Sequence, residues 1–228
     1  MDNITYILFL CQALPTLLAL ALLRGKPRVV VGFVIIGSTI CLLASEINGQ
    51  LLALFDNDML YYCTTISPAV EEILKALPVL FFAFFISDKL SSLVQISFAT
   101  GLGFAILENL IVMQQNIEEV TVLWAFLRGI GAGLMHGVCT VAVGIGISYI
   151  RKQKKMFVCG TLSLLFMAMT YHALYNAVIM SSIKYLGFAI PLITYIPINL
   201  FYTTRRRSHS KEKQSEESLA PPFYYHNQ

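Results

Sequence analysis

Long runs of apolar residues, separated by short polar or charged segments, dominate the chain. A helix needs about 20 apolar residues to cross the hydrocarbon core of a bilayer, and lipid offers the backbone no hydrogen-bond partners, so each run predicts a membrane-spanning α-helix. Seven runs reach or approach this length, and the last is short and contains two prolines: 4–23, 29–55, 63–86, 93–115, 123–149, 156–182 and 188–202. We therefore expect an all-α, polytopic transmembrane helical bundle.

The basic residues are distributed unequally among the predicted loops. If the N-terminus lies outside, thirteen Lys and Arg residues fall in cytoplasmic segments, and Lys184 alone falls on the outer side. Because positive charge is retained on the cytoplasmic side of a membrane, this bias predicts an outside N-terminus and a cytoplasmic C-terminus. Residues 205–228 are polar, charged and proline-bearing, which predicts a flexible cytoplasmic tail after a transmembrane domain over 1–204.

Composition narrows the class of protein. Hydrophobic residues make up 57% of the chain, charged residues 13%, and the mean hydropathy is +0.69. Since soluble domains carry about 25% charged residues, these values exclude an ordinary soluble enzyme, a disordered chain and a nucleic-acid-binding protein, and they make the lipid bilayer the expected surroundings. The five cysteines are scattered and form no CxxC pair, which argues against a disulfide framework and a thiolate zinc site.

Ionisable residues nevertheless lie inside the predicted spans, where a charge is costly unless it faces the bundle interior and finds a partner. They are Glu46, Glu71, Glu72, Lys75, Glu108, Arg128, His136 and His172. Helical spacing places Lys75 one turn after Glu71, which predicts a pair between these two and leaves Glu72 to reach a neighbouring helix. Arg128 is near the outer end of its span, so we expect it to extend to the interface. For Glu46 we expect a hydrogen bond between packed helices.

The acids and imidazoles share one depth. Counted from the outer ends of their spans they lie about 7 to 13 residues in, which is roughly 10–20 Å below the outer surface. Independent structural pairs would have no reason to share a level, so we predict one polar pocket in the outer half of the membrane. Carboxylates and imidazoles are general acid–base groups and metal ligands. A water held between a Glu and a His would attack a peptide carbonyl, and an Asn with a second His would stabilise the oxyanion.

Four short motifs on consecutive spans then carry a family resemblance: EEILK at 71–75, GFAILEN at 103–109, GLMHG around His136, and HALYN at 172–176. Together they resemble the motifs of PrsW-type intramembrane proteases, which belong with the CAAX-processing and bacteriocin-immunity membrane proteases. CAAX-type relatives carry EExxxR, FxxxH and HxxxN. Here Lys75 comes one residue before the position of that Arg, and Glu108 replaces the first His, and both departures favour the PrsW branch.

The resemblance implies an intramembrane endopeptidase in a bacterial-type plasma membrane. Its implied substrate is a single-span membrane protein, such as an anti-sigma factor cut at the first site of a stress-response cascade. The implied catalytic residues, and three residues expected to support them (Lys75, Phe104 and Asn109), all lie in spans three to six. The catalytic set is Glu71, Glu72, Glu108, His136, His172 and Asn176.

Metal dependence stays open at this point. Glu108, His136 and His172 would supply three zinc ligands and leave a position for water. Alternatively, Glu71 or Glu72 with His172 would activate water without a metal. Two other functions are compatible with buried charges: a proton-coupled carrier, and a non-catalytic immunity or scaffold member of the same superfamily. The carrier is disfavoured because we find no inverted repeat in the sequence and because the polar residues cluster at one depth.

Overall fold

The computed structural model of the protein describes residues 3–55, 58–118, 120–183, 185–197 and 200. Within these residues every regular element is a helix, which confirms the all-α prediction. The chain divides into two units, Met1–Pro191 and Leu192–Gln228, and all the elements that carry the candidate site belong to the first. The predicted tail over 205–228 and the domain boundary after residue 204 lie outside the described residues.

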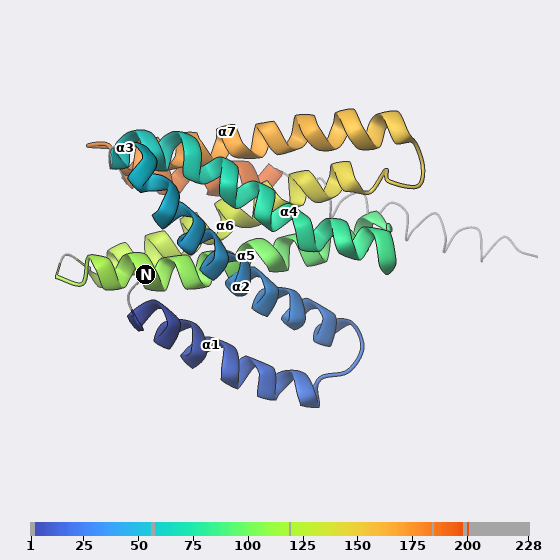
Figure 1. Ribbon diagram of the computed structural model, residues 1–228, viewed down its shortest axis with the longest axis horizontal. Helices are drawn as coiled ribbons and strands as arrows, with labels where there is room; N and C mark the ends of the chain where they lie inside the picture. The colour runs from blue at the N-terminus through green and yellow to red at the C-terminus, as the bar shows by residue number, and fades with distance from the viewer. Residues whose placement is uncertain (1–2, 56–57, 119, 184, 198–199, 201–228) are drawn as a thin grey trace, which may run out of the picture. The chain divides into compact units, whose positions relative to one another are not determined.

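The first two helices form a hairpin. Helix α1 spans Asn3–Leu22 and helix α2 spans Lys26–Leu52, and the two lie side by side in Figure 1. The turn between them requires a backbone conformation with positive φ, which Gly25 adopts at 67° without the steric cost that a Cβ would bring. Pro27 follows in the first turn of α2, where a missing N–H group is tolerated. A short 3₁₀ turn, η1 (Ala53–Phe55), ends this hairpin.

The third predicted span is built in three pieces. A single helical turn, α3 (Met59–Tyr61), leads through a π-helical turn, η2 (Tyr62–Ile66), into helix α4 (Ser67–Phe85). The Asp58 side chain accepts a hydrogen bond from the Tyr61 N–H group at 3.0 Å and so caps the start of this segment. Because α4 begins at Ser67, the pair Glu71 and Glu72 lies in its second turn.

The remaining helices follow the predicted spans closely. They are α5 (Leu90–Gln115), α6 (Val122–Ile147), the π-helical turn η3 (Met156–Gly160), α7 (Thr161–Ile179) and a last helix over Tyr185–Pro197. The Thr121 hydroxyl accepts a hydrogen bond from the Trp124 N–H group and caps α6.

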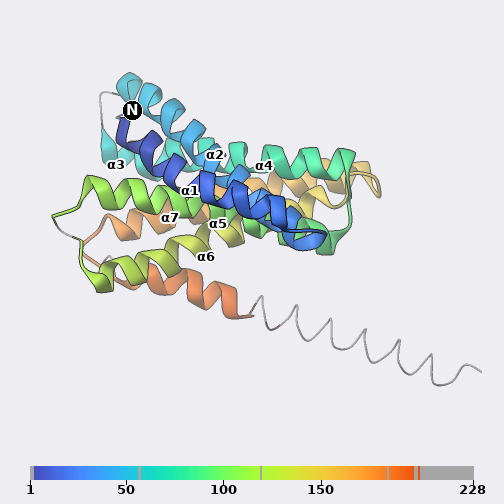
Figure 2. The same cartoon turned by 90° about the horizontal axis from the view of Figure 1, so that it is seen from below.

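Helices α5 and α6 form the centre of the bundle. Helix α5 packs against both α2 and α6, whereas α4 and α7 lie together on the side away from α1 (Figures 1 and 2). Glycines permit the close approaches: a Cβ on Gly103 would collide with the backbone of Val34 in α2, and one on Gly101 with the backbone of His136 in α6. Helix α6 also packs against α4 and α7, which in turn contact each other, so residues of these three helices meet.

The outer helices expose apolar surface, as expected of helices that face lipid. Five helical segments in the described residues are long and apolar enough to cross a membrane: Ile4–Leu22, Lys26–Phe55, Leu90–Gln115, Val122–Ile147 and Met156–Ile179. Helix α4 is not among them because its 19 residues include Glu71, Glu72 and Lys75. The helix Tyr185–Pro197 is shorter than the about 20 residues that a crossing needs. The chain is thus a membrane protein, and the count of seven spans and their orientation remain predictions.

Candidate active site

Glu72 of α4 is the centre of a buried polar cluster. Its Oε1 accepts a hydrogen bond from Lys75 Nζ at 2.6 Å and lies 2.9 Å from His172 Nδ1 of α7. All three side chains are almost completely enclosed. Because an ionised carboxylate only accepts hydrogen bonds, this short contact places a proton on His172 Nδ1, and in the neutral ring the lone pair then lies on Nε2.

A second branch of the cluster runs from α4 to α6 and α5. Lys75 Nζ lies 2.8 Å from His136 Nδ1, and His136 Nε2 lies 3.1 Å from Glu108 Oε2. An ammonium group can only donate, so His136 accepts at Nδ1 and donates its Nε2 proton to Glu108. Glu108 also pairs with Arg128 at 3.4 Å. Three helices are therefore linked by one continuous series of charged hydrogen bonds.

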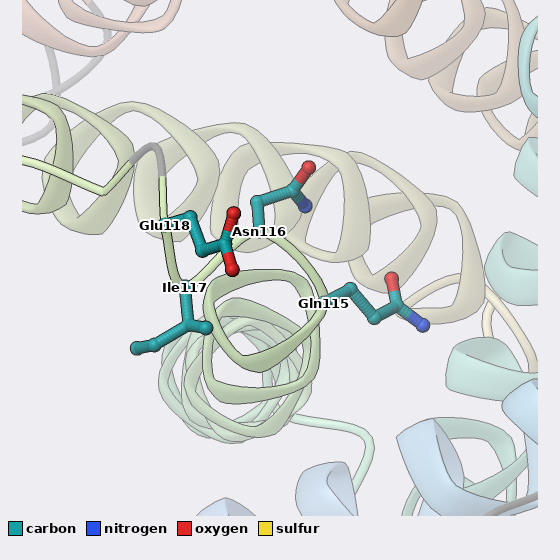
Figure 3. Close-up of a pocket in the computed structure, with 4 residues that line it drawn as sticks. All are labelled: Gln115, Asn116, Ile117 and Glu118. Carbon is teal, nitrogen blue, oxygen red and sulfur yellow. The ribbon is translucent and has the colours of Figure 1, made fainter.

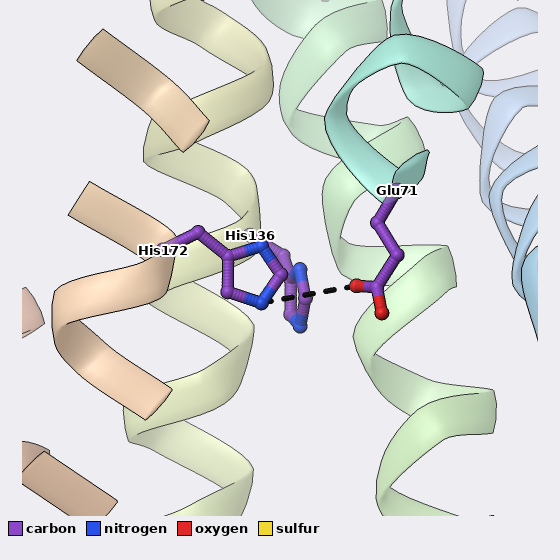
Figure 4. A group of neighbouring side chains, drawn as sticks. All are labelled: Glu71, His136 and His172. Carbon is purple, nitrogen blue, oxygen red and sulfur yellow. Dashed lines mark ion pairs between the residues drawn. The ribbon is translucent and has the colours of Figure 1, made fainter. Parts of the chain in front are cut away.

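Glu71 and His172 face each other across a short gap. His172 Nε2 lies 3.8 Å from Glu71 Oε2, which is too far for a hydrogen bond (Figure 4). Both atoms are buried, and neither has a hydrogen-bond partner among the residues that the structure describes. Two buried acceptors that point at each other without a donor are costly unless something else binds between them. The gap thus accepts a donor such as water, or a cation.

One group of side chains in the described part of the chain has the spacing of a metal site: Glu71, His136 and His172, each with a ligand atom within 4.8 Å of the others. Figure 4 shows these three side chains converging, with the two imidazole rings edge to face. The carboxylate differs from the expected set of Glu108, His136 and His172. Glu71 takes that place, while Glu108 pairs with Arg128 and with His136 Nε2.

The donor set fits a divalent metal in part. Glu71 Oε2 and His172 Nε2 present free lone pairs, which is the state that a metal ligand requires. Both nitrogens of His136 are engaged, by Lys75 and by Glu108, so His136 would join a metal only by releasing one of these contacts.

The other expected residues divide between the cluster and its surroundings. Phe104 belongs to it, because its ring lies 4.6 Å from Lys75 Nζ and 5.0 Å from the His136 ring. Asn176 instead donates to the Cys63 carbonyl in η2 at 2.9 Å. Asn109 lies beside Arg128 in a small crevice between α5 and α6, and its Oδ1 atom has no partner in the described residues. Glu46 accepts from Tyr6 of α1, which is the expected contact between helices.

Two of the predicted pairings are wrong. Lys75 binds Glu72 rather than Glu71: spacings of three and four residues are both within reach on a helix, and Glu72 Oε1 contacts both Lys75 and His172. Arg128 does not extend to the interface. It is buried, stacks on Trp124 with its guanidinium carbon 5.6 Å from the ring centre, and neutralises Glu108.

Three residues near the site were not predicted. Ser67 Oγ donates to Glu71 Oε1 at 2.6 Å, and Asn48 Nδ2 lies 3.3 Å from the same oxygen. Tyr62 donates to Asn48 Oδ1 at 2.8 Å. The spacing of four residues between Ser67 and Glu71 was a usable sequence signal. Nothing in the sequence linked Asn48, which lies in another helix, to this carboxylate.

A surface pocket also occurs at the end of α5. It has a volume of about 260 Å³ and is lined by Gln115, Asn116, Ile117 and Glu118 (Figure 3). These four consecutive residues are exposed, with Gln115 at the end of α5 and the other three in the turn after it, and they include no member of the buried cluster. The pocket therefore has no part in the chemistry considered below.

Comparison with known proteins supports a family assignment. A family model described as PrsW family intramembrane metalloprotease matches residues 25–202, which is more than half of the chain. The matched range contains every residue of the cluster, from Asn48 in α2 to His172 in α7. No curated protein and no solved structure matches the chain.

Proposed function

The chain belongs to the PrsW family of intramembrane metalloproteases, and from this premise we propose that it hydrolyses a peptide bond in a single-span membrane protein. The observation that carries the proposal is the gap between Glu71 Oε2 and His172 Nε2. Both atoms are buried acceptors without a donor in the described residues, and the gap lies inside a helical bundle. A water molecule that donates to both atoms would be polarised toward attack on a carbonyl carbon.

The two adjacent glutamates take different roles in this proposal. Glu71 faces the gap and would accept the proton of the attacking water, then return it to the leaving amine. Glu72 has one oxygen on both Lys75 and His172, so it would hold the His172 ring with Nε2 directed at the reaction. Lys75 would keep the carboxylates from repelling each other.

A bound metal would act at the same gap. Glu71 Oε2 and His172 Nε2 would hold it, with His136 as the third ligand once it releases Lys75 or Glu108. A divalent metal supplies Lewis acidity and makes its bound water a better nucleophile. The arrangement of Glu72 and Lys75 serves either route, because both routes need the His172 lone pair.

The proposed substrate and location rest on the motif resemblance and on the depth of the polar residues. An anti-sigma factor with one membrane span, cut at the first site of a stress-response cascade in a bacterial plasma membrane, is the substrate class that the motif resemblance favours. The shared depth of the acids and imidazoles favours cleavage in the outer half of the bilayer. Helix tilt can change that depth by several ångströms.

Cleavage by purified protein tests this function. Wild-type protein in lipid vesicles is mixed with a single-span anti-sigma factor, with and without a chelator, and compared with Glu71→Gln and His172→Ala. Loss of a general base or of its partner costs about 10²–10⁴-fold, so we expect kcat/KM to fall by at least about 100-fold in both variants. Glu118→Gln, in the exposed turn after α5, is the matched control and should cleave like wild type.

The chelator separates the two routes. Loss of cleavage on chelation, with recovery when Zn²⁺ is added back, supports a metal at Glu71 and His172. Unchanged cleavage supports the direct action of Glu71 on water. Full cleavage by both Glu71→Gln and His172→Ala would contradict the proposed function under either route.

A further inference from the structure

The second oxygen of Glu71, Oε1, is held on the side away from the gap. Ser67 Oγ, one turn earlier in α4, donates to it at 2.6 Å, and Asn48 Nδ2 of α2 lies 3.3 Å away. The carboxylate is therefore asymmetric: Oε1 has two donors, and Oε2 has none among the described residues. This asymmetry directs the free lone pairs of Glu71 toward His172.

The hydrogen bonds around Glu71 form a series in which each group donates to the next one, toward Glu71. Tyr62 Oη donates to Asn48 Oδ1 at 2.8 Å, and Asn48 Nδ2 donates to Ser67 Oγ at 2.9 Å. Ser67 in turn donates to Glu71 Oε1, which can only accept. Each hydroxyl or amide thus uses its proton on the next group, and aligned donors of this kind polarise and strengthen one another in a low dielectric.

The hydrogen-bonded series that ends at Glu71 connects residues of three different elements. Asn48 comes from α2, Tyr62 from the π-helical turn η2, and Ser67 from the first turn of α4. Tyr62 and Ser67 are buried, at 3% and 8% exposure. The turn that carries Tyr62 is also fixed by Asn176, which donates to the Cys63 carbonyl. The position of the Glu71 carboxylate is consequently set by its own helix together with two other elements.

We propose that Asn48, Ser67 and Tyr62 are positioning residues for Glu71, which hold its Oε1 so that Oε2 alone serves the reaction. This inference rests on the proposed function, because Glu71 takes part in a reaction only if the protein is a protease. None of the three residues lies in the motifs EEILK, GFAILEN, GLMHG or HALYN. Their role is to restrict the orientation of the Glu71 carboxylate. Mutation of residues that hold a catalytic or metal-binding side chain typically lowers activity or metal affinity 10- to 100-fold.

Kinetics provide the first test. Asn48→Leu and Ser67→Ala are expected to lower kcat about 10-fold per folded molecule and to leave KM within about twofold, because neither residue faces the gap. Ser67→Thr keeps the hydroxyl and is expected to restore kcat. The matched control is Ser38→Ala, which removes a buried hydroxyl of α2 that bonds to the Gly103 carbonyl and not to Glu71. Unchanged kcat in both Asn48→Leu and Ser67→Ala would overturn the proposal.

An infrared measurement tests the contact itself, without activity. For each protein, the spectrum of the same protein with Glu71→Gln added is subtracted, which isolates the carboxyl band of Glu71. Loss of a donor to Oε1 is expected to shift this band in Asn48→Leu and Ser67→Ala, and to leave it unchanged in Ser38→Ala. An unshifted band in both variants would show that the hydrogen-bonded series does not hold Glu71 and would end the proposal.

The two readouts also separate this inference from the function on which it depends. If wild-type protein cleaves no membrane substrate, the proposed function fails, and the infrared band still decides whether the hydrogen-bonded series holds Glu71. If wild type cleaves and the band shifts while kcat per folded molecule stays constant, the function stands and the positioning role is wrong.

Discussion

At the scale of single residues, Lys75 is the cation on which the cluster depends. Its side chain is completely enclosed, with Nζ bound to Glu72 at 2.6 Å and to His136 at 2.8 Å and with the Phe104 ring 4.6 Å away. A buried charge is tolerated only where it is paired and hydrogen-bonded. Lys75 therefore offsets the cost of burying Glu72 and connects α4 to α6.

Replacing Lys75 with methionine is expected to destabilise the fold. The substitution keeps the apolar stem but leaves Glu72 buried without its cation, and removing one partner of a buried pair costs about 3–5 kcal/mol. Reversible unfolding in mixed micelles measures the change in the free energy of unfolding. Lys152→Met is the control, because Lys152 is exposed and lies over the Tyr149 ring, and its loss should cost at most about 1 kcal/mol. Equal, small effects in both variants would mean that Lys75 carries no structural charge.

Sequence alone indicated the acids and imidazoles that the structure brings together, but it established neither their pairings nor the polar residues that surround Glu71. Periodicity places Glu71, Glu72 and Lys75 on one helix, yet it makes the three- and four-residue spacings equally available. The pairing depends on tertiary contacts: Glu72 Oε1 is within reach of both Lys75 and His172, and His172 comes from another helix. The sequence likewise indicated where Arg128 lies along its span but not its partner, because Glu108 lies in another helix, α5.

At the scale of elements, the contact between α5 and α6 positions His136. Gly101 of α5 lies against the carbonyl of His136, so the two backbones touch where the imidazole is attached. Small residues recur along α6 at steps of three or four, and they contribute unequally to the packing. Gly144 packs on Ser97, whereas Gly129 has open space around it. A glycine pattern indicates that helices approach closely, but it does not identify which glycines make the contact.

Alanine substitutions at Gly101 and at Gly129 are expected to have opposite effects. Gly101→Ala would place a Cβ against the backbone of His136, which cannot move aside as a flexible side chain can, so α5 and α6 must separate. We expect a loss of thermal stability and of cleavage. Gly129→Ala meets open space within a helix and should be neutral or stabilising by up to about 1 kcal/mol. Melting temperatures in detergent compare the two, and a stable, active Gly101→Ala variant would contradict the close packing.

At the scale of the whole molecule, apolar runs predicted the helices because hydropathy is a local property. Each of the seven predicted spans contains a helical segment, and the helix ends that lie in the described residues differ from the predicted ends by a few residues. The span with EEILK is the informative exception: α4 is as apolar on average as the other long helices, but it carries three charged residues among its 19. Its place in the bundle depends on partners in α6 and α7, which no local pattern encodes.

The orientation of the chain determines which half of the bilayer holds the site, and it can be measured directly. The charge bias predicts that the turn after α5 lies outside and the segment before α7 lies in the cytoplasm. In a background where the exposed Cys11 and Cys159 are replaced by alanine, a membrane-impermeant maleimide should label Asn116→Cys in intact cells. Gln153→Cys should react only after permeabilisation.

The reverse labelling pattern would invert the topology and carry a mechanistic consequence. Because the depth of Glu71 and His172 is counted from the outer ends of their spans, inversion would move the gap between them to the cytoplasmic half. The chemistry at Glu71 would be unchanged, but the substrate would be cut on the opposite side of the membrane. Labelling at Asn116 thus decides whether an extracytoplasmic segment of a single-span protein can reach the candidate site.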